Sequence, residues 1–311
     1  MTATSAHNTP GIPEVRLLRR LFIKNHGFLY LVPALVLFAI FVLYPIFYIL
    51  GASLTEWSGL GAKKYVGLDN YIRLFTDDRA FRLAMRNAVY WTFLTIFPQM
   101  IIGFILAYIL NSGIPLRNIF RAIFYMPAII SPVVVSIVWQ RIYNPFGGLL
   151  SDIGFEHNLD FLIQPYLSDP DIAIFSVIAI NVWQWTGFSM LMYVAGLQSL
   201  SEEVIEAARV DGANVFQLIL RVIWPMLRHV HLTLILLGVI GTLQTFALIF
   251  MLTKGGPNHS TQMLPNYIFQ QAFELNRMGY ASAVAVVLML VALSASLFQV
   301  KVFGSRFSIS Q

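Results

Sequence analysis

Cysteine is missing from this 311-residue chain, and charged residues make up only 11% of it. Without cysteine the chain forms no disulfide, has no thiol nucleophile and offers no thiolate to a metal ion. Soluble domains carry roughly a quarter charged residues, so the small charged share excludes an ordinary soluble domain. The hydrophobic share is 58%, and the two values together indicate an integral membrane protein.

Motifs for nucleotides, metals and nucleic acids are scarce as well. The sequence has no Gly-x-x-x-x-Gly-Lys-Ser/Thr, so a P-loop for ATP is excluded in this chain. Its six histidines are scattered, and His229-x-His231 begins an apolar run, which favours an interfacial pair over a metal site. The net charge of +5 is small and its basic residues lie between apolar runs, so no nucleic-acid partner is expected. We therefore expect neither a metal nor a cofactor in this chain.

Apolar runs of membrane-spanning length follow one another along the sequence. A bilayer core needs about 20 helical residues, and the first run also exceeds the roughly 7 to 15 apolar residues of a signal peptide. The pattern predicts an all-α polytopic membrane protein with six transmembrane helices. They are expected at 28–50, 88–110, 119–142, 171–197, 230–252 and 279–302.

The distribution of Lys and Arg predicts the orientation, because cytoplasmic loops are richer in them. The tail and the turn with Arg117 and Arg121 are basic, whereas residues 143–170 contain no Lys or Arg. Both termini are therefore expected in the cytoplasm, although the first external loop departs from the rule with six basic residues. The resulting segments are a cytoplasmic tail (1–27), a first transmembrane helix (28–50), an external loop (51–87) with a short amphipathic piece at 80–87, a core domain (88–305) containing a polar loop (201–228), and a cytoplasmic end (306–311).

The polar loop is predicted to form two short helices. Ser201 is expected to N-cap the first, which carries two glutamates in the turn where the helix dipole favours negative charge. Gly212 supplies the positive φ that ends this helix, and Asp211 or Asn214 caps the next one.

This loop also carries a family pattern: Glu206-Ala207-Ala208, then Asp211-Gly212-Ala213, Gln217, Ile223 and Pro225-x-Leu227. The gapped run resembles the EAA loop of binding-protein-dependent ABC importer permeases, carbohydrate class. In that family the loop forms a cytoplasmic coupling helix that docks into a groove of the ATPase subunit. The resemblance implies this coupling role for Glu203, Glu206, Ala207, Ala208, Asp211, Gly212 and Ala213.

Two further motifs resemble the same family. They are Gly67-Leu68-Asp69-Asn70-Tyr71 after the first span and Gly279-Tyr280-Ala281-Ser282-Ala283 at the last. The resemblance covers about residues 28–305 and implies a type I ABC importer permease fold in a bacterial inner membrane. It also implies a heterodimer with a second permease, two ATPase subunits that hold the ATP and Mg, and an extracytoplasmic solute-binding protein. The chain itself would perform no chemistry.

Polar and aromatic residues also occur at mid-span depth, where polar groups are costly unless they have partners. Amide groups beside aromatic rings suit a sugar, whose hydroxyls need hydrogen bonds and whose C–H faces stack on rings. In alignment with the maltose-type permease, most of these positions fall where that pocket lies, but only the asparagine is shared. The expected sugar pocket comprises Asn181, Gln184, Trp185 and Phe188 in the fourth span and Gly241, Thr242, Gln244 and Thr245 in the fifth.

Other interpretations stay open. Polar residues in spans also serve simply to bond neighbouring helices, each contributing under about 2 kcal/mol. An ABC permease for amino acids, peptides or phosphate is one alternative, although the expected pocket has no charge. An ion-coupled secondary transporter should have carboxylates deep in its spans, and spans two to six have none. A membrane scaffold or sensor without transport would not need clustered polar residues at mid-depth.

Overall fold

The computed structural model describes residues 30–304. The expected tail at 1–27 and end at 306–311 lie outside the described residues. The chain divides into two units, Met1–Gly51 and Ala52–Gln311, which are described separately.

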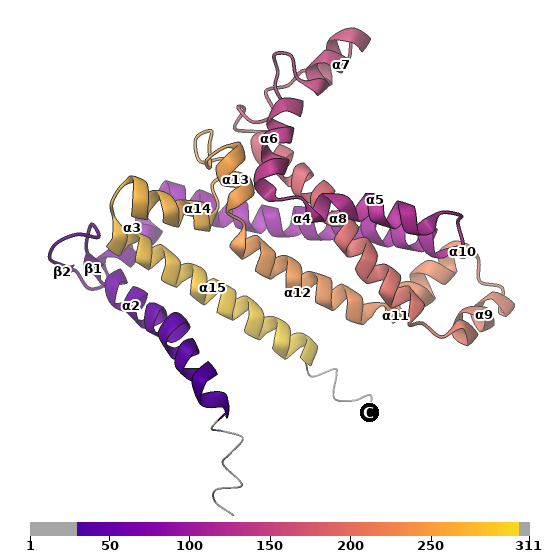
Figure 1. Cartoon of the computed structure of the whole chain (residues 1–311), viewed down its shortest axis with the longest axis horizontal. Coiled ribbons are helices and arrows are strands. Elements are labelled where there is room, and N and C mark those ends of the chain that lie inside the picture. Colours follow the sequence, from indigo (N-terminus) through magenta and orange to yellow (C-terminus); the bar gives the residue numbers. More distant parts are fainter. Residues whose placement is uncertain (1–29, 305–311) are drawn as a thin grey trace, which may run out of the picture. The chain divides into compact units, whose positions relative to one another are not determined.

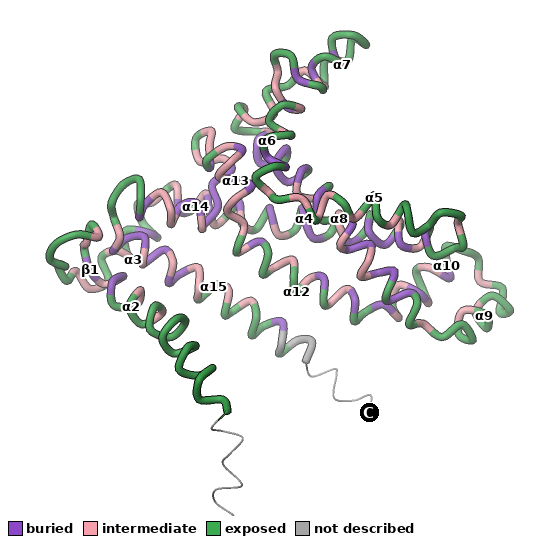
Figure 2. The backbone as a smooth tube through the Cα atoms, viewed as in Figure 1, coloured by how far each residue is buried: buried purple, intermediate pink, exposed green. Residues whose placement is uncertain are grey.

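A single helix forms the described part of the first unit. It begins at Tyr30 and continues to Ser53, just past the unit boundary. Ala39–Leu43 (η1) is wound as a π-helix, and Tyr44–Ser53 (α2) completes the helix. Most residues along this helix are exposed (Figure 2), as expected for a helix surrounded by lipid.

Helices form nearly all of the second unit (Figure 1). In chain order its elements are β1 (Thr55–Glu56), β2 (Lys64–Tyr65), α3 (Asp69–Thr76), α4 (Arg79–Asn111), α5 (Arg117–Ile129), α6 (Pro132–Ile142), α7 (Leu149–His157), η2 (Asp160–Leu162), α8 (Ala173–Gln198), α9 (Glu202–Val210), α10 (Val215–Gln217), the π-helical η3 (Leu218–Ile223), α11 (Trp224–Met226), α12 (Arg228–Gln244), α13 (Ala247–Leu252), α14 (Leu264–Phe269), the π-helical η4 (Gln270–Glu274) and α15 (Met278–Gly304).

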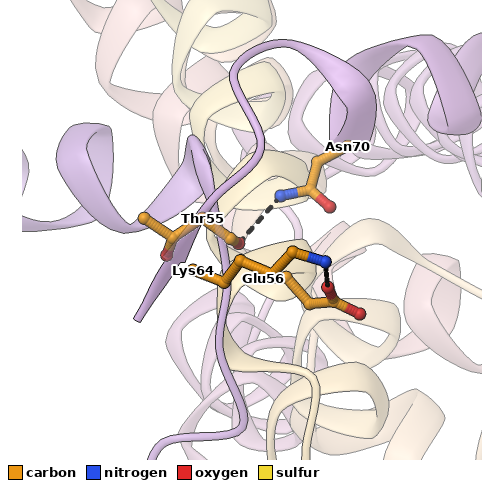
Figure 3. Close-up of polar contacts among 4 residues, drawn as sticks. All are labelled: Thr55, Glu56, Lys64 and Asn70. Atoms are coloured by element: carbon orange, nitrogen blue, oxygen red, sulfur yellow. Dashed lines mark hydrogen bonds and ion pairs between the residues drawn. The ribbon is translucent and has the colours of Figure 1, made fainter. Parts of the chain in front are cut away.

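The two family-like motifs meet at the start of this unit. β1 and β2 form a short antiparallel hairpin, closed by an exposed Lys64–Glu56 ion pair at 3.5 Å. Asn70 donates its amide to the Ser53 carbonyl oxygen at 2.8 Å and to the Thr55 carbonyl oxygen at 3.0 Å, and Figure 3 shows the second of these bonds. A Cβ at Gly279 would lie 1.9 Å from the Thr55 oxygen, so only glycine lets α15 approach this closely. The motifs therefore anchor the hairpin between α3 and α15.

α4 and α8 form the most extensive helix pair. A Cβ on Gly103 of α4 would lie 2.8 Å from the Ser189 Cβ, so this glycine sets the close approach of the two helices. Buried apolar side chains from both helices and from α12 make one core, which includes Phe104, Met190 and Tyr193. Buried positions recur along the whole of α8, from Ala173 to Leu197.

The third expected span, 119–142, is not one continuous helix. α5 and α6 meet at 96°, and Figure 1 shows α5 beside α8 while α6 turns away. Ile130 and Ser131 are extended, with ψ of 135° each, because the residue before a proline avoids the helical conformation and Pro132 begins α6. The span expected at 119–142 is therefore a bent pair of helices, α5 and α6.

The fifth expected span, 230–252, is broken too. α12 ends at Gln244 and α13 resumes at Ala247, with Thr245 extended at ψ 107°. α10–α11 and α12 also meet at 65°, so the loop helix leads into the span through a bend. Among the described residues, four helices are long and apolar enough to cross a membrane, or up to six if each bent pair is one span. The predicted six spans agree with that upper count.

α4 begins earlier than expected. Residues 80–87 were predicted as a separate amphipathic piece of the external loop, but they form the first turns of α4. Asp78 caps this helix, since its Oδ1 accepts from the Phe81 N–H at 2.9 Å. Its Oδ2 accepts hydrogen bonds from the hydroxyls of Tyr267 and Tyr280. One carboxylate thus ties α4 to α14 and α15.

Candidate functional site

A cavity of about 450 Å³ opens between α4, α8, α12 and α13. Every residue that the sequence predicted for a pocket lines it, from α8 and from the C-terminal end of α12. These are Asn181, Gln184, Trp185, Phe188, Gly241, Thr242, Gln244 and Thr245. None of the described residues that line this cavity carries a charged side chain.

A third wall of the cavity was not predicted. Trp91, Thr95 and Gln99 of α4 contribute to the lining, and Gln99 is the one polar group among them that is not buried. Their spacing of four residues places them on one helix face. That spacing is a signal in the sequence, but it lies in a run whose other residues are apolar except for Thr92.

Asn181 of α8 and Gln99 of α4 both line the cavity and are hydrogen-bonded to each other. The Gln99 Nε2 donates to the Asn181 Oδ1 at 3.0 Å and lies 3.3 Å from its backbone oxygen. A carboxamide has both a donor and an acceptor end, so Asn181 keeps its NH₂ group and Gln99 its carbonyl oxygen for a second partner. The pair therefore presents one donor and one acceptor, held in position by their mutual bond.

Gln184 is placed differently from its neighbours. Its side chain is only 1% exposed, and its Nε2 donates to the Ile130 carbonyl oxygen at 3.1 Å. Ile130 ends α5, where the break leaves carbonyl groups without helical partners. The amide of Gln184 therefore supports the broken third span, and its donor is not available to a solute.

The aromatic and hydroxyl groups complete the lining. Trp185 is 40% exposed, and its ring stands nearly perpendicular to Phe188 with centroids 6.2 Å apart. The hydroxyls of Thr242 and Thr245 donate within α12, to Gly238 at 3.0 Å and Gly241 at 2.9 Å. Because their protons are engaged, these oxygens are left as acceptors. The cavity thus combines an aromatic platform with fixed amide and hydroxyl groups.

The polar loop adopts the two predicted helices. Ser201 is the N-cap residue of α9 but makes no capping bond through its side chain. Gly212 has φ +82° in open space, as predicted for the helix end, and a β-branched residue is strained in this conformation. Asn214, rather than Asp211, caps the next helix, through reciprocal bonds with Gln217 at 2.8 and 3.0 Å.

The residues with the implied coupling role lie together on this loop. Ala208 and Ala213 are half-buried, while the other members are exposed: Glu203, Glu206, Ala207, Asp211 and Gly212. Beside them lie three exposed apolar side chains, Val210 (86%), Val215 (64%) and Phe216 (70%). Exposed apolar side chains near charged ones are common on protein-binding surfaces.

An aromatic cluster connects this loop to the helical core. His231 of α12 bonds to the Tyr193 hydroxyl at 2.8 Å and to the Trp224 carbonyl oxygen at 2.9 Å. The Trp224 ring also packs edge-on against Phe104, with centroids 5.0 Å apart. His231 is thus a structural residue, and residues 30–304 contain no group of three or more His, Cys, Asp or Glu side chains placed to hold a metal ion.

A bundle of membrane-length helices around an uncharged cavity that holds several amide and hydroxyl groups has the form of a solute-transport subunit. The chain matches the family described as "Binding-protein-dependent transport system inner membrane component" over residues 99–307, and it belongs to that family. It is therefore a multi-pass membrane protein of the ABC permease class, as the EAA-like loop predicted.

Individual relatives agree with this assignment. The chain is 35% identical to the probable ABC transporter permease protein YurN of Bacillus subtilis, covering 89% of this chain and 95% of that protein. It is 32% identical to the multiple sugar-binding transport system permease protein MsmF of Streptococcus mutans, covering 91% and 97%. A bacterial alginate ABC transporter, solved with an alginate pentasaccharide-bound periplasmic protein, has a similar chain (TM-score 0.77, 25% identity, covering 89% and 94%). These likenesses confirm the predicted type I permease fold and carbohydrate class.

Proposed function

We propose that this chain is the permease subunit through which an ATP-driven, binding-protein-dependent importer carries a sugar across the cytoplasmic membrane. The observation that carries the proposal is the uncharged cavity, in which amide groups lie beside Trp185 and Phe188. Sugars are bound by this combination, because their hydroxyls exchange hydrogen bonds while their C–H faces stack on aromatic rings. The name of MsmF supports a sugar as the solute.

The cavity argues against other solutes of ABC permeases. A phosphate, a free amino acid or a uronate oligosaccharide carries full charges, and burial of an unpaired charge is costly. None of the described residues lining the cavity offers a counter-ion. We therefore infer a neutral oligosaccharide or polyol as the solute.

The loop at 201–228 is proposed to receive the ATPase. Val210, Val215 and Phe216 supply an exposed apolar surface, and Glu203 and Glu206 supply charge at its edge. The complete importer would contain a second, different permease, two ATPase subunits that bind ATP and Mg, and an extracytoplasmic solute-binding protein. Both termini of this chain would then lie in the cytoplasm, and the chain itself would catalyse no reaction.

Transport would proceed by alternating access. Closure of the ATPase dimer would displace α9, and the Trp224–His231–Tyr193 cluster would carry this movement to α8 and α12. These helices supply most of the cavity lining, so their movement would open it to one side of the membrane and then to the other.

A reconstitution experiment tests this function. The chain is purified with its co-expressed partner subunits, placed in proteoliposomes with ATP inside, and supplied with the cognate binding protein outside. Uptake is measured for labelled neutral oligosaccharides, uronate oligosaccharides and free amino acids. Saturable ATP-dependent uptake of a neutral sugar is expected. Uptake of an amino acid or a uronate in preference to neutral sugars would refute the proposed solute class.

A further inference from the structure

Three arginines form a stripe on the first turns of α4. Arg79, Arg82 and Arg86 are spaced by three and four residues, which places them on one helix face, and all three are exposed. They are half of the basic residues that make loop 51–87 an exception to the usual charge distribution. The structure therefore concentrates this unexplained charge on one surface.

The axial position of the stripe matches a membrane surface. α4 has 33 residues, well beyond the roughly 20 needed to span the hydrocarbon core. Its apolar run begins at residue 88, so Arg86 lies about 3 Å and Arg82 about 9 Å beyond it at 1.5 Å per residue. The headgroup layer is about 5–8 Å deep on each side. Helical side chains point toward the N-terminus, so the Arg86 guanidinium lies within this layer, whereas Arg82 lies at its outer edge and Arg79 beyond it.

An exposed aromatic surface continues the same face into the span. Tyr90, Phe93 and Phe97 follow Arg86 at spacings of three and four, and each is more than 40% exposed. The rings of Phe93 and Phe97 are stacked, with centroids 5.9 Å apart. Arg86 lies 5.7 Å from the centre of the Tyr90 ring, which joins the basic and aromatic parts of the face.

The charge of the stripe is not neutralised within the described part of the chain. The one ion pair found there joins Lys64 to Glu56 on the hairpin. The nearby carboxylate of Asp78 is occupied by the two tyrosine hydroxyls and the Phe81 N–H. Arg82 donates to a backbone oxygen, that of Thr76 at 2.8 Å, and forms no ion pair with a described carboxylate.

We propose that this arginine stripe binds the phosphate of an anionic phospholipid whose acyl chains lie along Tyr90, Phe93 and Phe97. Arginine is suited to phosphate because its planar fork donates two parallel hydrogen bonds. The continuous apolar surface beneath the stripe favours a lipid over an acidic soluble protein, which would leave the rings uncovered. The proposal rests on membrane insertion alone and not on the sugar or on the orientation of the chain.

Lipid retention by the purified complex provides the test. The complex is incubated in detergent with equal amounts of phosphatidylglycerol and phosphatidylcholine, excess lipid is removed, and bound lipid is measured by mass spectrometry. The wild-type complex is expected to retain phosphatidylglycerol at least about fivefold over phosphatidylcholine. The variant R79Q/R82Q/R86Q is expected to lose at least two thirds of this preference. Glutamine is a good helix former, so α4 should keep its structure.

Matched variants separate the stripe from general charge effects. R141Q/K254Q/R277Q removes the same charge from exposed positions outside α4 and should keep the preference. R79K/R82K/R86K keeps the charge without the planar fork and should retain an intermediate preference. Equal retention of phosphatidylglycerol by wild type and R79Q/R82Q/R86Q would overturn the proposal.

Two further outcomes would also overturn it. Displacement of the lipid signal by glycerol 3-phosphate alone at equal concentration would indicate a site for the free headgroup. Unchanged lipid retention, with loss of stimulation by the solute-binding protein in R79Q/R82Q/R86Q, would indicate a protein-docking surface. None of these measurements depends on sugar uptake, so failure of the lipid site can be distinguished from failure of the proposed function.

Discussion

The buried amide of Gln184 donates to the carbonyl oxygen of Ile130 at 3.1 Å, across the break between α5 and α6. The break between α12 and α13 is supported in the same way, since the Asn266 amide of α14 donates to the Phe246 carbonyl oxygen at 3.2 Å. Within a membrane, water cannot take the place of a lost helical partner. Each interruption is therefore stabilised by a side-chain amide from a different helix.

Gln184→Leu should destabilise the protein, because it leaves the Ile130 carbonyl oxygen without its donor while nearly preserving volume. We expect a loss of about 1–2 kcal/mol in the free energy of unfolding, measured by thermal or denaturant unfolding in detergent. Gln244→Leu is the matched control, since Gln244 is exposed in the same cavity. Equal stability of both variants would show that the hydrogen bond from the Gln184 side chain does not stabilise the break between α5 and α6.

Trp185→Ala should weaken transport without unfolding the protein. An aromatic platform contributes about 0.5–1.5 kcal/mol to such contacts, so the KM for uptake should rise roughly 3- to 10-fold. Trp183→Ala is the control, because Trp183 is similarly exposed but packs edge-on against Trp139 at 5.5 Å and does not line the cavity. An unchanged KM for Trp185→Ala would remove this ring from the binding surface.

Gly187→Ala should prevent close packing of α5 on α8. A Cβ at Gly187 would lie 2.0 Å from the backbone oxygen of Phe124, which a small side-chain movement cannot relieve. Gly241→Ala has nothing within 4 Å and lies inside a helix, so it should be neutral or stabilising by up to about 1 kcal/mol. Yield and apparent melting temperature in detergent should fall only for Gly187→Ala. A similar melting temperature for the two variants would contradict the close contact.

Gly212→Val should impair coupling, because a β-branched residue at φ +82° costs free energy in the turn after α9. Gly212→Asn is the control, since asparagine tolerates this conformation. We expect the valine variant to insert normally but to copurify with several-fold less ATPase subunit, and the asparagine variant to behave like wild type. Normal ATPase recovery and normal sugar-stimulated hydrolysis in Gly212→Val would exclude the proposed coupling role.

Asp78→Ala should release α4 from α14 and α15. It removes a helix cap, worth about 1 kcal/mol, and leaves two tyrosine hydroxyls without their acceptor, so a loss of about 2–4 kcal/mol is expected. Asp77→Ala, at the exposed neighbour, should change stability by less than about 0.5 kcal/mol. Thermal unfolding of the two variants side by side gives the comparison. A small effect of Asp78→Ala would mean that the tyrosines find other partners.

The same contact predicts a dependence on alkaline pH. Burial raises the pKa of Tyr267 well above its ordinary value of 10.0, and the bond to Asp78 raises it further. A raised pKa stabilises the fold fully below the unfolded value and progressively less above it. The contribution of Tyr267 should therefore persist to about pH 10 and decline as the pH rises further. Tyr267→Phe should show a smaller decline.

The pocket residues could be predicted because polar groups are costly within a span and their helical spacing is short-range information. Asn181 and Trp185 were found in this way, and the structure places them in one cavity with Thr242. Whether they bind the solute stays a prediction. Trp91 and Thr95 were missed, because only the three-dimensional packing of α4 against α8 shows that their face meets the cavity.

The breaks show the same limit. Pro132 is a local signal for the first, whereas nothing local announces the second, where neither proline nor glycine occurs at Thr245 or Phe246. It depends on Asn266, twenty residues later, which supplies the missing partner. The early start of α4 was missed for a related reason, since its arginine-rich first turns are typical of a loop until Asp78 is seen to cap them.

Gly187 has a mechanical consequence. Because the Phe124 carbonyl occupies the volume that any larger residue would fill, α5 cannot slide along α8 there without steric collision. It can still rock about that point, which then acts as a fulcrum. If the N-terminal end of α5 moved toward one side, its C-terminal end, beside the bend into α6, would then move toward the other side.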